Sequence, residues 1–514
     1  MKPSKHSETR RLFLQRSIAV GAAGMAPLVY RLEAMAAAGA QNVEPRILTK
    51  AADATIDIAA QNPNYKALVC MFMYGGNDNA NFIIPYDQAE YDTYATARTV
   101  LAIPRTGDPT SATVNSRGLI PLGALASQGG RTLAFHPNVG RNNVVDPALF
   151  RSDGLPALWD TGKLAIVGNV GPLVVPLTKI EYTNKTKARP QNLFSHSDQV
   201  ATWMTSASAG YASTGVGGRI ADLVDSMNVP PAGQPKIATC ISISGVNKYQ
   251  TADFAQSYQI NSSGPVGLSP IQFFNYASSS NTAINGAINA AFTDQTTRLR
   301  SNYFETQWGG MMNYSLQTRT AINAALAANP LPAALIFRTT NNSLSSQLKM
   351  VAKLVAASTQ LGMVRQIFFV QIGGFDTHGS EFHPQNNANW NKISEAVYDF
   401  QQAMNGINAA NQVTLFSASD FGRTLDSNGG GTDHGWGGHH FVAGGAVHGG
   451  DLYGTFPTVA LGTSTDINRG ALLPTTSIDQ FHGTLATWFG VSNSDLATVV
   501  PNLSNFTTKN LGFV

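Results

Sequence analysis

The sequence has few charged residues for its length. Of its 514 residues 13% are charged, whereas about 25% is usual for a soluble domain. A chain that is 43% hydrophobic with a formal net charge of +3 is not a disordered polymer, because disordered chains combine high net charge with little apolar content. The small positive balance also argues against nucleic acid as a partner, since surfaces that bind it cluster many basic residues.

Cysteine is scarce as well, with Cys70 and Cys240 as the only two. Two cysteines cannot build a disulfide framework or a cysteine-rich zinc module. Both lie inside apolar segments, where we expect them to be small core residues. The 48 glycines and 25 prolines make turns frequent, so the composition predicts a large, loop-rich globular protein.

The first 36 residues have the features of an export signal. The pair Arg10-Arg11 precedes a mildly apolar stretch at 18–30 and a small-residue cleavage site, Ala34-Met35-Ala36. The apolar stretch is shorter than the ~20 residues that span a bilayer, and twin-arginine leaders are read by a bacterial translocase. We therefore predict a twin-arginine signal peptide at 1–36 and the Tat translocase as a partner during export. The mature protein is expected to be periplasmic or secreted, with no stable membrane anchor.

Short apolar runs, each bounded by a polar or glycine-rich turn, predict a buried, largely parallel sheet. The runs lack alternation between polar and apolar residues, which suits strands that are covered on both faces. Ligands of such sheets bind beyond the carboxyl ends of the strands, so polar residues at those ends are the first functional candidates. The runs are residues 67–74, 163–167, 237–244, 365–372, 413–417 and 441–447.

Helical periodicity separates several of these runs. Apolar residues repeat on one helix face at Leu344, Leu348, Val351 and Val355, and again from 390 to 407. Alternating helices and strands predict an α/β fold with the sheet sandwiched between helices, and we expect one domain over 37–514. The stretch at about 247–342, rich in Asn, Ser, Ala and Gln, is interpreted as an inserted, mostly helical cap with helices near 283–301 and 306–326.

Histidine and aspartate residues gather near the C-terminus. Six of the ten histidines lie between 378 and 448, and the pairs Asp376/His378 and Asp433/His434 occur where strands are predicted to end. A carboxylate and an imidazole together suit a divalent ion. One such pair is a weak signal, but two pairs at strand ends predict a metal site. Asp78, just after the first strand, is the candidate third carboxylate, with a turn-forming role as its alternative.

These motifs resemble the alkaline phosphatase and sulfatase superfamily, in which an early Asp and later Asp and His residues form a metal centre. More narrowly, the chain resembles an exported bacterial family labelled domain of unknown function 1501. That likeness extends from about Tyr65 to the C-terminus, is diffuse over 247–342, and implies an alkaline-phosphatase-like fold with metals at the strand carboxyl ends. The motifs are the twin-arginine leader, Gly-Gly-Asn-Asp78, Phe-Ser195-His196, Gly-Gly-Phe-Asp376-Thr-His378, Phe-Gly-Arg423-Thr and Gly-Thr-Asp433-His434-Gly.

The resemblance implies two sets of metal ligands. Asp78, Asp433 and His434 correspond to the ligands of one ion. Asp376, His378 and a later histidine correspond to the ligands of the other. We expect one or two divalent ions, with zinc, manganese and calcium as the candidates.

The later histidine is open among several residues. His440 is the first choice and His439 the second, while His448 and His482 remain alternatives. In many superfamily members the Asp and His that correspond to Asp376 and His378 are four residues apart, whereas here they are two apart. His383 could therefore take the role of the paired histidine, or the site could hold one ion.

The superfamily also places a nucleophile at a helix N-terminus beside a metal. Ser195 and Asp198 fit a Ser-x-x-Asp capping box that opens a helix, and the free N–H groups of that helix would attract an anion. Ser195 is the candidate nucleophile or metal contact, with His196 beside it as a ligand or acid–base group. The alternatives are that Ser195 only caps the helix, or that Ser197 or a metal-bound water attacks.

Arg423 follows a predicted strand and is the candidate clamp for a phosphate or sulfate group, which a guanidinium binds by two parallel hydrogen bonds. Its alternative is an ion pair with Asp420 or Asp426. Together the motifs predict a metal-dependent hydrolase of phosphate or sulfate esters in the bacterial cell envelope. Its substrate would be a small anionic ester or an ester carried on a polymer. The alternatives are a non-catalytic exported binding or scaffold protein on the same fold, and a phosphotransferase or mutase.

Overall fold

The computed structural model describes residues 56–108, 118–140, 151–265, 282–298, 301–379 and 382–514. The predicted signal peptide at 1–36 lies outside these residues, and so does the side chain of His383. None of the described helices combines the length and the apolar character needed to cross a membrane.

A nine-stranded sheet forms the centre of the molecule, in the order β13-β5-β12-β9-β1-β8-β6-β7, with β14 also paired to β5. Neighbouring strands are parallel, except that β12 is antiparallel to both β5 and β9. Each of the six apolar runs overlaps one of these strands, which confirms the predicted large, mostly parallel sheet. The strands are β1 (Lys66–Met73), β5 (Leu164–Gly171), β6 (Cys240–Ser242), β7 (Ser257–Gln259), β8 (Arg365–Ile372), β9 (Val413–Ser419), β12 (Gly438–Gly444), β13 (Leu452–Tyr453) and β14 (Thr476–Ser477).

The central strands are buried on both faces, as their continuous apolar sequences predict. Side chains of β1 alternate between two hydrophobic cores, one on each side of the sheet, because successive residues of a strand point in opposite directions. Ala67, Val69, Met71 and Met73 belong to one core, and Leu68, Cys70 and Phe72 belong to the other.

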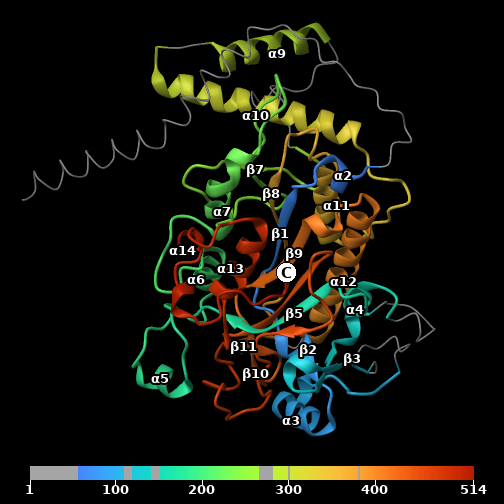
Figure 1. The fold of residues 1–514 in the computed structure, drawn as a ribbon, viewed down its shortest axis with the longest axis vertical. Coiled ribbons are helices and arrows are strands. Elements are labelled where there is room, and N and C mark those ends of the chain that lie inside the picture. The colour runs from blue at the N-terminus through green and yellow to red at the C-terminus, as the bar shows by residue number, and fades with distance from the viewer. Residues whose placement is uncertain (1–55, 109–117, 141–150, 266–281, 299–300, 380–381) are drawn as a thin grey trace, which may run out of the picture.

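Helices cover both faces of the sheet (Figure 1). The core that contains Val69 is closed by residues of α3 (Gln88–Arg98), α4 (Gly154–Asp160), α10 (Tyr303–Ala328), α11 (Ser343–Ala356) and α12 (Phe382–Gly406). The core that contains Cys70 is closed by residues of α6 (His196–Thr205), α7 (Val216–Val224), α13 (Ile478–Phe489) and α14 (Leu496–Val499). The result is the predicted α/β arrangement of a sheet between helices.

Smaller elements complete the fold. The helices α2 (Ile58–Gln61) and α5 (Lys179–Asn184) are short. Strands β2 (Ile83–Pro85), β4 (Arg131–Phe135) and β3 (Ile120–Leu125) form an antiparallel three-stranded sheet in that order. Strands β10 (Arg423–Ser427) and β11 (Thr432–His434) form an antiparallel pair.

The stretch at 247–342 contains the two predicted helices, as α9 (Thr282–Thr297) and α10. They lie at one end of the molecule, opposite α3 (Figure 1). The same stretch also contains β7, which pairs in parallel with β6. Part of the stretch therefore extends the central sheet.

Candidate metal centre

Three loops meet where neighbouring strands of the central sheet end. β1 lies between β8 and β9, and all three run in parallel, so the loops that follow them emerge at the same edge. Gly75 follows β1, Asp376 follows β8, and Asp420 directly follows β9. Gly75 has φ of +116°, and a Cβ atom there would lie 2.3 Å from the backbone nitrogen of Asp376. Only glycine permits this close approach of the two loops.

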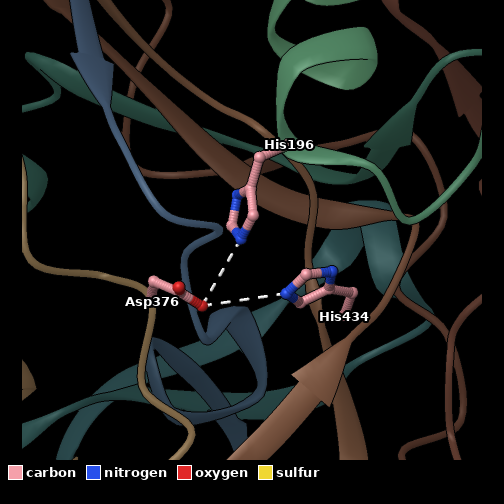
Figure 2. Close-up of side chains that lie close together, drawn as sticks. All are labelled: His196, Asp376 and His434. Carbon is pink, nitrogen blue, oxygen red and sulfur yellow. Dashed lines mark ion pairs between the residues drawn. The ribbon is translucent and has the colours of Figure 1, made fainter.

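Asp376 is the centre of a group of three imidazoles, which we call the Asp376 cluster (Asp376, His196, His378 and His434). Its Oδ1 atom lies 2.9 Å from Nε2 of His378, 3.5 Å from Nε2 of His196 and 3.7 Å from Nε2 of His434. Figure 2 shows the rings of His196 and His434 turned toward this carboxylate. His196 opens α6, and His434 ends β11.

The outer nitrogen of each imidazole faces an oxygen acceptor. Nδ1 of His196 donates to Oδ2 of Asp420 at 2.7 Å, and Nδ1 of His434 donates to the carbonyl of Phe194 at 2.6 Å. Nδ1 of His378 lies 3.6 Å from Oδ1 of Asp433. Outer acceptors of this kind fix the tautomer of metal-binding histidines and raise their basicity. When these two rings are neutral, donation from Nδ1 leaves the lone pair on Nε2, which faces Asp376 in both His196 and His434.

Two observations on charge fit a cation at this point. Nε2 of His196 is buried and makes no hydrogen bond, although it lies 3.5 Å from Oδ1 of Asp376. Burial lowers the pKa of His434, which favours the neutral form of this ring. Two lone pairs that face a carboxylate oxygen repel it unless a cation or a proton lies between them.

The spacing also fits a metal ion. Ligand atoms about 2.1 Å from a tetrahedral zinc ion lie about 3.4 Å from one another, close to the 3.5 and 3.7 Å found here. In the described part of the chain, His196, Asp376 and His434 are the one group whose ligand atoms converge within 4.8 Å. His378 is next to this group, with its Nε2 2.9 Å from Nε2 of His434. Imidazole nitrogens suit zinc and other transition metals, whereas calcium prefers oxygen.

Arg423 is buried next to the Asp376 cluster and does not face solvent. Its side chain is buried and pairs with Asp376, and its other N–H groups donate to the carbonyls of Gly75, Gly76 and Thr432. The predicted role as an anion clamp is therefore not what the structure shows, because its donors are already used inside the protein. Burial acts to raise the pKa of Asp376, but the hydrogen bond and charge of Arg423 outweigh it and hold that pKa below its ordinary value.

The predicted ligands Asp78 and His440 lie outside the Asp376 cluster. Asp78 is fully buried in an ion pair with Arg98 of α3. His440 lies in β12, where Nδ1 is 3.3 Å from the Ser417 hydroxyl and the ring packs against Trp203. β12 places the His440 ring in the core against Trp203 of α6. The spacing of histidines in the sequence did not reveal this burial.

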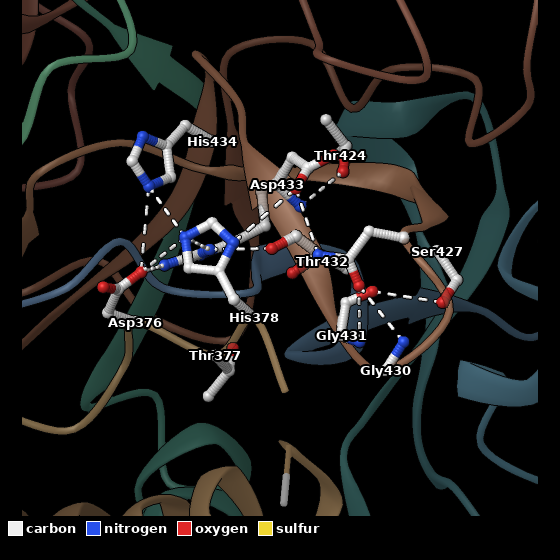
Figure 3. Close-up of polar contacts among 12 residues, drawn as sticks. Asp376, Thr377, His378, Thr424, Ser427, Gly430, Gly431, Thr432, Asp433 and His434 are labelled. Atoms are coloured by element: carbon white, nitrogen blue, oxygen red, sulfur yellow. Dashed lines mark hydrogen bonds and ion pairs between the residues drawn. The ribbon is translucent and has the colours of Figure 1, made fainter. Parts of the chain in front are cut away.

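Asp433 reaches the cluster only through His378. Neighbouring residues of a strand point to opposite faces, so Asp433 and His434 of β11 cannot both face Asp376. Asp433 forms an ion pair with Arg469 and accepts a hydrogen bond from Asn428 at 3.0 Å. Its backbone N–H is held by the hydroxyl of Thr424, as Figure 3 shows. Asp433 is thus an outer partner of His378.

The helix predicted at Ser195 begins there, but the capping box does not form. Ser195 is the N-cap of α6 without a side-chain hydrogen bond to the backbone. Its hydroxyl instead donates to Oδ2 of Asp198 at 2.6 Å and lies 3.3 Å from the hydroxyl of Ser197. Among the described residues, neither serine hydroxyl contacts the Asp376 cluster.

The alternative histidines also lie elsewhere. His439 is buried in β12 and stacks on Phe456. His482 is buried and bonds to the Ser206 hydroxyl. His448 is exposed, and its Nδ1 donates to the carbonyl of Gly512 at 2.9 Å.

Asp420 is the functional candidate that the sequence hypothesis undervalued, since it was considered only as a partner of Arg423. It accepts from His196 and also from the N–H of Gly75, at 3.1 Å. Its position directly after an apolar strand was the available signal. The carbonyl of Phe194 gave no signal in the sequence, because any residue has one. Phe194 has φ of +71°, an uncommon conformation for a residue other than glycine.

Comparisons with known proteins bear on the family. No curated protein sequence matches the chain. A crystal structure of a mutant of the alkaline phosphatase PafA is similar over 69% of this chain, with 9% sequence identity and a TM-score of 0.23. The chain spans 63% of the length of that protein. The family described as "Protein of unknown function (DUF1501)" matches residues 65–500. The chain therefore belongs to the DUF1501 family.

Proposed function

We propose that this protein is a metal-dependent hydrolase of phosphate or sulfate esters that acts in the bacterial cell envelope. The observation that carries the proposal is the convergence of three imidazole Nε2 atoms on Oδ1 of Asp376, each with its outer nitrogen facing an acceptor. The export step rests on the twin-arginine motif of the sequence, and the ester chemistry rests on the resemblance of the motifs to alkaline phosphatases and sulfatases.

His196, His434 and Asp376 would hold one divalent ion, with His378 as a fourth ligand or an acid–base group. When bound, such an ion supplies Lewis acidity and neutralises the negative charge of an ester. Zinc and manganese remain candidates, and the nitrogen-rich ligand set disfavours calcium.

The side chains of the three histidines differ in their exposure to solvent. The side chain of His378 is 44% exposed, against 35% for His196 and 24% for His434. His378 is also the histidine whose outer contact is the loosest, at 3.6 Å. It is therefore the imidazole most accessible to a substrate, while His196 and His434 are held in position by shorter hydrogen bonds.

The proposal is tested by metal analysis of the purified mature protein, with hydrolysis of p-nitrophenyl phosphate and p-nitrophenyl sulfate measured in parallel. We expect about one transition metal per chain, and a melting temperature that falls when the metal is chelated, since an ion that binds only the folded state stabilises it. We expect His434→Ala to lose the metal and to lower any hydrolysis by more than the 10- to 100-fold that is typical of outer-partner mutations.

The matched control is His448→Ala, because His448 is an exposed histidine remote from the cluster. It should keep the metal, the activity and the melting temperature. Less than one-tenth of a metal ion per chain after growth with zinc and manganese would overturn the proposal. So would a full metal content in the His434→Ala protein.

A further inference from the structure

A pocket lies against α6, the helix that carries His196. Its cavity has a volume of about 450 Å³, within the range of small-molecule sites. It is lined by residues of α6, by the loop at 207–212 and by residues 246–248. We call it the Tyr211 pocket.

The Tyr211 pocket shares its wall with the metal centre. In the first turn of α6, His196 faces Asp376, whereas Ser197 and Asp198 line the pocket. The ring of Tyr74 also lines it, and the N–H of the next residue, Gly75, donates to Asp420, the partner of His196. A molecule in the pocket would therefore contact the two residues that directly follow His196 in α6.

The charge of the lining selects for a neutral ligand. Asp198 and Lys248 are the only charged residues among the described residues that line the pocket, and their charges are opposite. The other polar groups of the lining are hydroxyls and amides, which both donate and accept hydrogen bonds. This is the complement of a ligand with many hydroxyl groups.

Ser208 is a polar group in this lining without a partner. Its side chain is 1% exposed, and its hydroxyl makes no hydrogen bond to any of the described residues. Buried hydroxyls nearly always have a partner in native proteins, so each exception calls for an explanation. A hydroxyl of a bound ligand would supply that partner.

Tyr211 offers a flat apolar surface at the same pocket. The residue is 79% exposed, yet its hydroxyl is held at 3.2 Å by the amide of Asn192 and at 3.4 Å by Oδ1 of Asp198. The ring is thus fixed at its polar end while its face stays open. A tyrosine ring combines an apolar body with a polar tip, and its open face can pack against the C–H face of a sugar.

We propose that the Tyr211 pocket binds a neutral sugar ring, which belongs to the alcohol part of the ester that the protein hydrolyses. Tyr211 provides the stacking surface, and Asp198, Asn192 and Ser208 provide hydrogen bonds to the hydroxyl groups. The link to hydrolysis rests on the proposed function, whereas the sugar-binding step does not. The proposal narrows the substrate class to sugar phosphates or sugar sulfates, including esters carried on a polysaccharide.

The test is binding of the metal-chelated mature protein to an array of neutral and sulfated glycans, followed by titration with the strongest neutral glycan. We expect binding to at least one neutral glycan. Tyr211→Ala should weaken it at least tenfold, while Tyr211→Phe, which keeps the ring, should stay within about threefold of the natural protein. Phe254→Ala is the matched control, because Phe254 is another exposed aromatic residue, 62% exposed, outside the pocket lining.

Failure to bind any neutral glycan overturns the proposal, and so does binding that Tyr211→Ala leaves intact. Recognition of sulfated glycans alone also overturns it, because the pocket lining has no net charge. Sugar binding by a protein that contains no metal as purified, before any chelation, would leave the sugar-binding step standing and refute the hydrolase. Ester hydrolysis without sugar binding would support the hydrolase and refute the sugar-binding role of the Tyr211 pocket.

Discussion

At the scale of single residues, four of the described histidines show two contrasting environments. His196 and His434 each donate from Nδ1 to a fixed acceptor and direct Nε2 at Asp376. His440 and His482 lie in the apolar core, where each contacts a serine hydroxyl. The residue type is the same in both sets, so the difference in chemistry comes from what surrounds each ring.

Asp420 is predicted to control metal affinity without touching the metal. Asp420→Ala removes the acceptor for Nδ1 of His196, so the ring loses its orientation and we expect the metal dissociation constant to rise by 10- to 100-fold. Asp420→Asn keeps an oxygen that can accept the same hydrogen bond and should recover part of the affinity. Competition with a chelator of known affinity measures both variants.

The control for Asp420 is Asp495→Ala, a carboxylate beside α14 that bonds to Ser492. It should bind metal as the natural protein does. Natural affinity in the Asp420→Ala protein would show that Asp420 does not position His196.

At the scale of elements, the direction of a side chain depends on which helix or strand carries it. The first turn of α6 directs His196 to the candidate metal centre and Asp198 to the Tyr211 pocket. In β11 the alternation of side chains directs His434 to the centre and leaves Asp433 with Arg469. Residues that are close in sequence, such as His196 and Asp198 or Asp433 and His434, thus serve different sites because the helix and the strand direct their side chains differently.

The loop after β1 is predicted to tolerate no side chain at Gly75. Gly75→Ala would combine a positive φ with a Cβ atom 2.3 Å from the backbone of Asp376. Gly245→Ala is the matched control, because its φ is +78° and no atom lies within 4 Å of the added Cβ. The control should lose about 1–2 kcal/mol of unfolding free energy for the backbone conformation alone.

Gly75→Ala should lose a further 1–3 kcal/mol or so, as overpacked sites do, together with the bound metal. Urea unfolding and metal analysis measure the two effects. Equal losses of stability in the two variants, with metal retained in both, would contradict the close approach of the two loops.

At the scale of the whole molecule, buried histidines make stability depend on pH. Burial lowers the pKa values of His439, His440 and His482 to about 3 each, whereas the unfolded chain protonates histidine near pH 6.5. Between these values the unfolded state binds more protons, so its population rises as pH falls. The stabilisation is complete above about pH 6.5 and is lost progressively toward pH 3.

Asp479 acts in the opposite direction, since burial raises its pKa to about 7 and its contribution falls as pH rises from about 4 to 7. Three histidines outweigh one carboxyl group, so we expect the urea midpoint of the metal-chelated protein to fall between pH 6.5 and 4.5. His482→Asn should flatten this slope, while His448→Asn, at an exposed position, should not. A midpoint that stays constant or rises on acidification would contradict the prediction.

The sequence by itself determined the order of strands and helices and the family, and it pointed to the loops whose aspartates and histidines form the candidate metal centre. It could do so because burial on two faces gives continuous apolar strands, and because polar residues follow strands at the functional edge of such sheets. Only the tertiary structure decided that His196 joins Asp376 and His434, while Asp78 pairs with Arg98 and His440 enters the core. The reason is geometric: β8 and β9 both pair with β1, although β1 ends at Met73 and they begin only at Arg365 and Val413. The direction of each side chain also depends on the element that carries it.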